Sequence, residues 1–122
     1  MILIVDDNDA IREMQAAVLE SSNYSVRQAA DGNTALALAA EQRPSLVLMD
    51  ITMPGMTGYQ VLGRLRELYG NALPIVMVSA LPEDEERDIA LAKGATDYIS
   101  KPFDIPSVLR CVNKFLTDKV TA

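Results

Sequence analysis

The fold is decided by residues 46–55, which read LVLMDITMPG. Four apolar residues end abruptly at the carboxylate of Asp50, and the turn residues Pro54 and Gly55 follow shortly afterwards. Short apolar runs bounded by turn residues are typical of buried strands in parallel sheets, where ligands bind beyond the carboxyl ends of the strands. We therefore expect Asp50 at the mouth of a site. Taken alone, Asp50 is more simply an aspartate that caps a loop, because Asp often stabilises turns.

Four further strand-like runs alternate with helical segments along the chain. The five expected strands are 2–5, 25–29, 46–49, 74–78 and 97–99. Helix starts are indicated by Asn8, by Asp31-Gly32-Asn33, by Thr57, by the acidic run after Pro82 and by Asp104 or a residue near it. Strict alternation predicts right-handed crossovers and an α/β fold, a three-layer sandwich around a wholly parallel sheet. The order of the strands does not follow from this alternation.

Apolar spacing predicts which face of each helix packs on the sheet. The inward-facing residues are expected to be Ile11, Met14 and Val18 in the first helix, Val61, Leu62, Leu65 and Leu68 in the third, and Val108, Val112, Phe115 and Leu116 in the fifth. Glycines indicate helix ends, so the third helix is expected to end at Gly70-Asn71 and the fourth at Lys93-Gly94.

Length and composition predict one globular domain that comprises residues 1–122. Hydrophobic residues make up 49% of the chain, without a long uncharged run of the kind that crosses a membrane. The first apolar run is too short for a signal peptide and lacks a basic flank, so a cytoplasmic location is expected. Cys111 is the single cysteine, which excludes an internal disulfide.

The charged residues exclude several classes of function. The net charge is −6 and the eleven basic residues are scattered, which argues against direct binding of nucleic acid by this domain. The chain has no histidine, which removes hydrolases that need a His base and, together with the single cysteine, any ordinary zinc site. Its chemistry must come from carboxylates, hydroxyls and amines.

Charged or hydroxyl-bearing residues follow four of the five expected strands. They occur in Asp6-Asp7, Asp50, Ser79-Ala80 and Lys101-Pro102. The carboxyl ends of neighbouring parallel strands share one edge of the sheet, so three carboxylates and one ammonium would converge there. Oxygen-only ligation suits a hard divalent cation, above all Mg²⁺. A cation, a hydroxyl and a lysine together indicate a phosphoryl-transfer site, with Asp50 as the candidate nucleophile.

Each of these residues also has a simpler interpretation. Asp6-Asp7 after a strand is often only a helix-capping turn, and Ser79 alone is an ordinary loop residue. Lys101 alone fits a solvated charge, and Tyr98 fits half-buried core. The functional interpretation depends on the joint pattern, in which suitable residue types occur at four separate strand ends.

The chain resembles the receiver domains of two-component response regulators over essentially its whole length. The matching motifs are Asp6-Asp7, the segment 50–58 (DITMPGMTG), Ser79-Ala80 and the segment 98–103 (YISKPF). Each motif is weak alone, and the set is highly specific. The resemblance implies a flavodoxin-like (βα)5 fold with strand order 2-1-3-4-5, similar to that of chemotaxis regulators.

The resemblance implies a role for each matching position. Asp50 would accept the phosphoryl group, with Lys101 paired to the phosphoryl oxygens and Ser79 moving to hydrogen-bond one of them. Asp7 would bind Mg²⁺ directly, Asp6 largely through water, and Thr52 through its backbone carbonyl, with Mn²⁺ as a substitute for Mg²⁺. Tyr98 would be the aromatic switch that turns inward when Ser79 moves. Ala80, Pro54, Gly58 and Pro102 would have structural roles at the site, with a cis Lys101–Pro102 bond.

The resemblance also implies partners. A histidine kinase or histidine phosphotransfer protein would supply the phosphoryl group, and the face formed by the fourth helix, fifth strand and fifth helix would control an output domain or effector. Homodimerisation on phosphorylation is a further expectation. The domain would be no general enzyme, since it would catalyse only its own phosphorylation and dephosphorylation.

Two other interpretations stay open at this stage. A phosphatase with an Asp nucleophile would need a second acid two residues after Asp50, where the sequence has Thr52. A binding module that kept the fold and lost phosphorylation would be expected to lack one of Asp6, Asp7, Asp50 or Lys101. A stand-alone regulator, a receiver cut from a longer regulator and a receiver carried by a hybrid kinase all fit the sequence.

Overall fold

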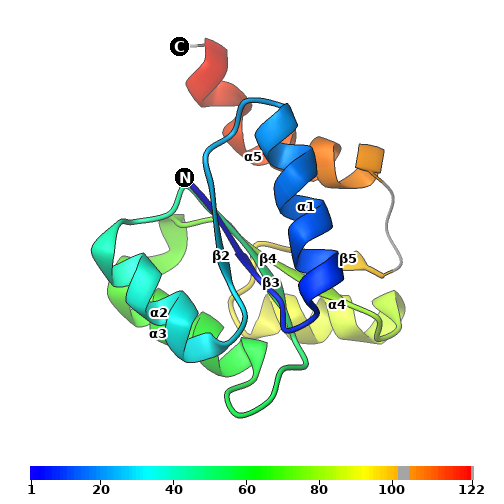
Figure 1. The fold of residues 1–122 in the computed structure, drawn as a ribbon. Coiled ribbons are helices and arrows are strands. Elements are labelled where there is room, and N and C mark those ends of the chain that lie inside the picture. Colours follow the sequence, from blue (N-terminus) through cyan, green and yellow to red (C-terminus); the bar gives the residue numbers. More distant parts are fainter. Residues whose placement is uncertain (102–104, 122) are drawn as a thin grey trace.

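The computed structural model describes residues 1–101 and 105–121, in which strands and helices alternate along the chain (Figure 1). The elements are β1 (Ile2–Val5), α1 (Asp9–Ser21), β2 (Val26–Ala29), α2 (Gly32–Glu41), β3 (Leu46–Asp50), α3 (Gly58–Tyr69), the 3₁₀ turn η1 (Gly70–Ala72), β4 (Ile75–Ser79), α4 (Glu83–Ala92), β5 (Asp97–Ser100) and α5 (Ile105–Thr121). The predicted strand boundaries are correct to within one residue. Pro102 and Asp104, for which the sequence made predictions, lie outside the described residues.

The five strands form one parallel sheet in the order β2-β1-β3-β4-β5. Alternate residues of each strand point to opposite faces. On one face Leu3, Val47 and Met77 pack against α2, α3 and α4; on the other, Ile4, Leu48 and Val78 pack against α1 and α5. Every residue of β1, β3 and β4 is buried, as expected for inner strands of a parallel sheet. The predicted three-layer sandwich and strand order are confirmed.

The predicted helix caps of α1, α2 and α3 are confirmed. The side chains of Asn8, Asp31 and Thr57 accept hydrogen bonds from the backbone N–H groups of Ile11, Thr34 and Gln60. The Gln60 side chain also returns a bond to the Thr57 backbone, which completes a capping box. All three capped ends lie beyond the carboxyl ends of strands, so each helix directs its positive end toward that edge of the sheet.

Two residues predicted to lie on buried helix faces, Met14 and Leu68, are exposed, and Ile11 and Val18 of the predicted α1 face are only half-buried. In α1 the buried residues are Gln15, Ala16 and Leu19, whereas Met14 is 38% exposed. The predicted stripe missed part of the buried face because Gln15 is polar and Ala16 is small, so neither carries a strong apolar signal.

In α3, Val61, Leu62 and Leu65 are buried as predicted, but Leu68 is 56% exposed. At the end of that helix Tyr69 takes the inward place, and its hydroxyl donates to the carbonyl of Ala39 in α2. In α5 the prediction is confirmed, since Val108, Val112 and Leu116 are buried and Phe115 packs beside them.

Candidate functional site

Three carboxylates converge at the carboxyl edge of the sheet. Asp6 and Asp7 follow β1, and Asp50 is the last residue of the neighbouring strand β3. One carboxylate oxygen from each lies within 4.8 Å of the others. Asp6 and Asp50 are buried, at 1% and 7% exposure, while Asp7 is exposed. The predicted convergence of strand ends therefore brings together acids that are more than 40 positions apart in sequence.

Lys101 is the one side-chain cation, within the described residues, that pairs with the carboxylates of this cluster. Its Nζ lies 3.0 Å from Oδ2 of Asp6 and 3.6 Å from Oδ2 of Asp50. The backbone N–H of Lys101 donates to the carbonyl of Ser79 at 2.7 Å, which extends the pairing of β5 with β4 by one residue. This backbone bond fixes the direction from which the lysine reaches across to β3 and β1.

The site holds more negative charge than Lys101 can neutralise. Burial raises the pKa of the Asp50 carboxyl to about 6, Lys101 opposes that rise, and the charges of Asp6 and Asp7 add to it. A backbone hydrogen bond from Thr52 also favours the ionised form. Three carboxylates facing one ammonium resist full ionisation unless a further cation joins them. The donor set is made of carboxylate oxygens, which fits Mg²⁺.

Asp6 and Asp7 differ in how they are held. The Oδ1 of Asp6 accepts the backbone N–H of Asn8 at 2.9 Å, and its Oδ2 contacts Lys101. Asp7 lines an open hollow of about 620 Å³ together with Asp31–Asn33 of the β2–α2 connection and Pro54–Met56 of the β3–α3 loop. Asp6 is thus fixed inside the site, and Asp7 faces the open hollow.

Gly58 allows α3 to begin directly against the end of β3. A Cβ at this position would lie 2.1 Å from the carbonyl oxygen of Asp50 and 2.9 Å from Cα of Ile51. The Gly58 N–H donates to the carbonyl of Ile51 at 2.8 Å. Gly55, in the exposed turn before it, has a φ of +78°, which favours glycine. These two glycines shape the loop that carries Thr52 and Pro54 past Asp50.

Ser79 and Tyr98 meet at the backbone of Leu81. The Ser79 Oγ accepts the Leu81 N–H at 3.1 Å, and the Tyr98 hydroxyl donates to the Leu81 carbonyl at 2.7 Å. Both side chains are buried, at 2% and 1% exposure, so Tyr98 already points inward while Ser79 is bonded to the Leu81 backbone. Ala80, which separates Ser79 from Leu81 in the chain, is exposed and small. The β4–α4 loop thus connects the two residues through main-chain groups.

Two contributors to this site were missed in the sequence. Leu81 acts through its backbone, which carries no sequence signal. Arg12 donates to the carbonyl of Asp6 at 2.9 Å, and a signal for it existed: a cation in the first turn of α1, where the helix macrodipole disfavours positive charge. Within the part of the chain that the structure describes, no helix is long and apolar enough to cross a membrane.

Comparison with known families agrees with this architecture. Residues 2–113 match the family model described as the response regulator receiver domain. The chain belongs to this family of two-component response regulators, in which the receiver is the phosphoacceptor domain and interacts with histidine kinases and output domains. Receiver domains are generally Mg²⁺-dependent, and the cluster of Asp6, Asp7 and Asp50 could hold a metal ion.

Individual relatives differ in length. The chain is 37% identical to the DNA-binding dual master transcriptional regulator RpaA of Synechocystis over 98% of its own length, but spans only 51% of RpaA. It is 34% identical to Protein PilH of Pseudomonas aeruginosa over 94% of this chain and 96% of PilH. The sequence therefore matches both a receiver-sized protein and about half of a longer regulator.

Solved structures show the same fold. Chemotaxis protein CheY4 of Vibrio cholerae is similar with a TM-score of 0.88 and 34% identity, covering 94% of this chain and 97% of CheY4. The receiver domain of NtrX from Brucella abortus gives a TM-score of 0.89 and 32% identity, covering 96% and 98% of the two chains.

Proposed function

We propose that Asp50 is the phosphoacceptor of this receiver domain. A carboxylate oxygen of Asp50 attacks the phosphorus of a phosphohistidine or of a small acyl phosphate, and an acyl phosphate bond forms as the bond to the donor's nitrogen or oxygen breaks. The donor leaves with the electron pair of that bond. The observation that carries this assignment is the convergence of Asp6, Asp7 and Asp50 with Lys101 at the end of the sheet.

We propose that Asp7 and Asp50 bind Mg²⁺ directly, that Asp6 acts largely through water, and that Thr52 offers its backbone carbonyl. When bound, Mg²⁺ supplies positive charge that neutralises the transferring phosphoryl oxygens. The imbalance that raises the pKa of Asp50 supports this assignment, because a cation relieves it. Mn²⁺ has the same preference for oxygen ligands and is expected to substitute.

Lys101 and Ser79 then act on the transferred group. Lys101 already lies within 3.6 Å of Asp50, so its ammonium is placed to pair with a phosphoryl oxygen. Ser79 accepts the Leu81 N–H, which leaves its own hydroxyl hydrogen available to donate. Ala80 keeps the approach open because it is small.

The switch is proposed to pass through Leu81. If the Ser79 hydroxyl moves toward the phosphoryl group, the Leu81 N–H loses its acceptor and the β4–α4 loop shifts, together with the carbonyl that holds Tyr98. The charge change at Asp50 would thereby bias the position of α4 relative to β5. Phosphorylation needs only to favour one of two states differentially, and about 5.5 kcal/mol would move a 1:99 ratio to 99:1.

The α4-β5-α5 face is the proposed output surface. Arg87 of α4 contacts Asp97 and the carbonyl of Tyr98 in β5, and Lys114 of α5 lies 3.6 Å from Asp97. These ion pairs join the three elements, so a shift of α4 would be transmitted across the face. The proposed partners are an output domain or effector protein on this face, or a second copy after phosphorylation, and a histidine kinase or phosphotransfer protein in the cytoplasm as donor.

The phosphatase alternative is less well supported. Such an enzyme needs a second acid positioned to protonate its leaving group, and Thr52 occupies the position two residues after Asp50. We propose instead that the domain promotes only its own phosphorylation and dephosphorylation.

Intact mass after incubation with acetyl phosphate and Mg²⁺ tests the assignment. We expect the wild type to gain one phosphoryl mass, Asp50→Asn to gain none, and the surface control Asp84→Asn to behave as wild type. Stoichiometric labelling of Asp50→Asn would refute the acceptor assignment. Saturable Mg²⁺ binding by calorimetry separates a receiver from a module that has lost the site, because only the former retains the cation site.

A further inference from the structure

Arg12 lies beside the carboxyl edge of the sheet, in a setting that is unusual for a cation. It belongs to the first turn of α1, where the helix macrodipole disfavours positive charge, and its side chain is only 12% exposed. Its Nε donates to Oε1 of Gln28 at 3.2 Å, its Nη1 donates to the main-chain carbonyl of Asp6 at 2.9 Å, and its Nη2 lies 2.8 Å from Oδ1 of Asp9. One guanidinium thus joins α1, β2 and the end of β1.

The carbonyl that Arg12 holds belongs to the peptide leading into Asp7. The carboxylate of Asp6 has its own supports, from the N–H of Asn8 and from Lys101. The carboxylate of Asp7 is exposed, and within residues 1–101 and 105–121 no hydrogen bond or ion pair holds it. The direction of Asp7 therefore depends on its main chain, and Arg12 is the side chain that fixes the preceding peptide.

We propose that Arg12 is a positioning residue for the divalent cation, acting through the Asp6–Asp7 peptide to aim the carboxylate of Asp7. This inference rests on the proposed function, since it assumes that Asp7 is a cation ligand. The fork geometry matters as well as the charge, because the three contacts of Arg12 come from three separate nitrogens, whereas a lysine carries all its donors on one nitrogen and cannot span the same three acceptors.

Positioning and simple electrostatics predict opposite results. If Arg12 influenced the site only by its charge, it would repel Mg²⁺, and replacing it by a neutral residue would tighten binding. If Arg12 aims Asp7, its replacement weakens binding, by roughly 10- to 100-fold as for other groups that orient metal ligands. Arg12→Lys separates the two, because the charge is kept and the geometry is lost.

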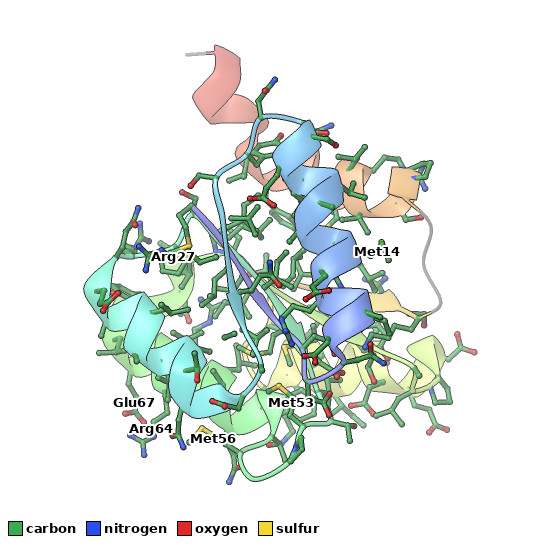
Figure 2. The ribbon with its side chains drawn as sticks, viewed as in Figure 1. Met14, Arg27, Met53, Met56, Arg64 and Glu67 are labelled. Carbon is green, nitrogen blue, oxygen red and sulfur yellow. The ribbon has the colours of Figure 1, made fainter. Side chains whose placement is uncertain are left out.

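The experiment measures the Mg²⁺ dissociation constant by calorimetry at pH 7.5 for wild type, Arg12→Lys, Gln28→Ala and Arg27→Lys. We expect Arg12→Lys to bind about 10-fold or more weakly. We expect Gln28→Ala to weaken binding less and in the same direction, since it removes the acceptor of Nε but leaves Arg12 charged. Arg27→Lys is the matched control, because Arg27 lies next to Gln28 on β2 but pairs with Glu41 of α2 at 3.2 Å. Its side chain lies away from Met53 of the β3–α3 loop (Figure 2).

A kinetic readout separates positioning from general damage. The initial rate of acetyl phosphate labelling, followed against Mg²⁺ concentration, should reach a plateau close to wild type at a raised half-saturating concentration. Unchanged or tighter Mg²⁺ binding in Arg12→Lys would overturn this inference alone. Absence of binding in the wild type would overturn the proposed function and this inference with it. If Arg12→Lys does not fold, wild-type affinity in Gln28→Ala overturns the inference.

Discussion

The two edges of the sheet arrange charged side chains in opposite ways. At the amino edge, the guanidinium of Arg66 donates to the carbonyls of Gly94, Gly70 and Leu73 and reaches Oγ1 of Thr96, so that one cation closes the connections before β4 and β5. At the carboxyl edge, three carboxylates converge, and the ammonium of Lys101 pairs with two of them, Asp6 and Asp50. The first arrangement satisfies every nitrogen of its charged group. The second leaves a charge imbalance that costs stability and favours a cation.

The close approach at the carboxyl edge is expected to give the largest mutational effect. Gly58→Ala would place a Cβ 2.1 Å from the backbone oxygen of Asp50, and backbone at the end of a buried strand cannot move aside cheaply. We expect the free energy of unfolding to fall by about 3 kcal/mol or more in urea titrations.

Gly63→Ala is the control on the same helix, because nothing lies within 4 Å of its added Cβ. It should raise stability by about 0.5–1 kcal/mol, since alanine favours helix. Equal stabilities of the two variants would show that Gly58 is not held against β3.

The amino edge is expected to give the next largest effect. Arg66→Met keeps much of the packing and removes the donors to three backbone carbonyls, so we expect a loss of about 2–3 kcal/mol in the free energy of unfolding. Arg64→Met, on the exposed surface of α3 (Figure 2), should change it by less than about 0.5 kcal/mol. A similar small effect in both would mean that the amino edge does not depend on this guanidinium.

The smallest expected change in the free energy of unfolding is an increase, and it comes from Asp50 at the carboxyl edge. In the metal-free protein with chelator, Asp50→Asn should be more stable than wild type at pH 7.5, by on the order of 1–2 kcal/mol. The pKa of Asp50 is raised from 3.8 to about 6 in the folded state. Asp50 therefore lowers stability progressively as the pH rises from about 3.8 to about 6, and the full cost is present above 6. Below about 3.8 it is protonated in both folded and unfolded states.

The difference in the free energy of unfolding between Asp50→Asn and wild type should accordingly shrink as the pH falls from 7 toward 4. Urea unfolding at each pH measures it. A gap that widens on acidification would contradict the sign of the pKa shift. Addition of Mg²⁺ should reverse the order at pH 7.5, because a bound cation stabilises the folded wild type.

The sequence was sufficient for the elements that carry strong local signals. Buried strands such as 46–49 are continuous apolar runs, and the caps Asn8, Asp31 and Thr57 have side chains that are favoured at helix starts. These signals placed Asp50 and Lys101 at strand ends, and the parallel sheet then brought them together. The roles of individual site residues were carried by the family resemblance.

The sequence was insufficient where packing or main-chain groups decide the outcome. Gln15 and Ala16 are buried in α1 because of where the helix meets the sheet, and their side chains give no apolar signal. Leu68 continues an apolar pattern, yet the end of α3 turns it to solvent while Tyr69 packs inward. The contacts of Leu81 with Ser79 and Tyr98 use groups that every residue but proline has.

That main-chain connection at Leu81 has a consequence for how such a domain can diverge. The side chain of Leu81 is 39% exposed and takes no part in the two hydrogen bonds that connect Ser79 with Tyr98. Any residue other than proline could stand there and preserve both bonds. Single substitutions at this position can therefore change the exposed surface beside Ser79 and Tyr98, while the main-chain connection between these two residues is kept.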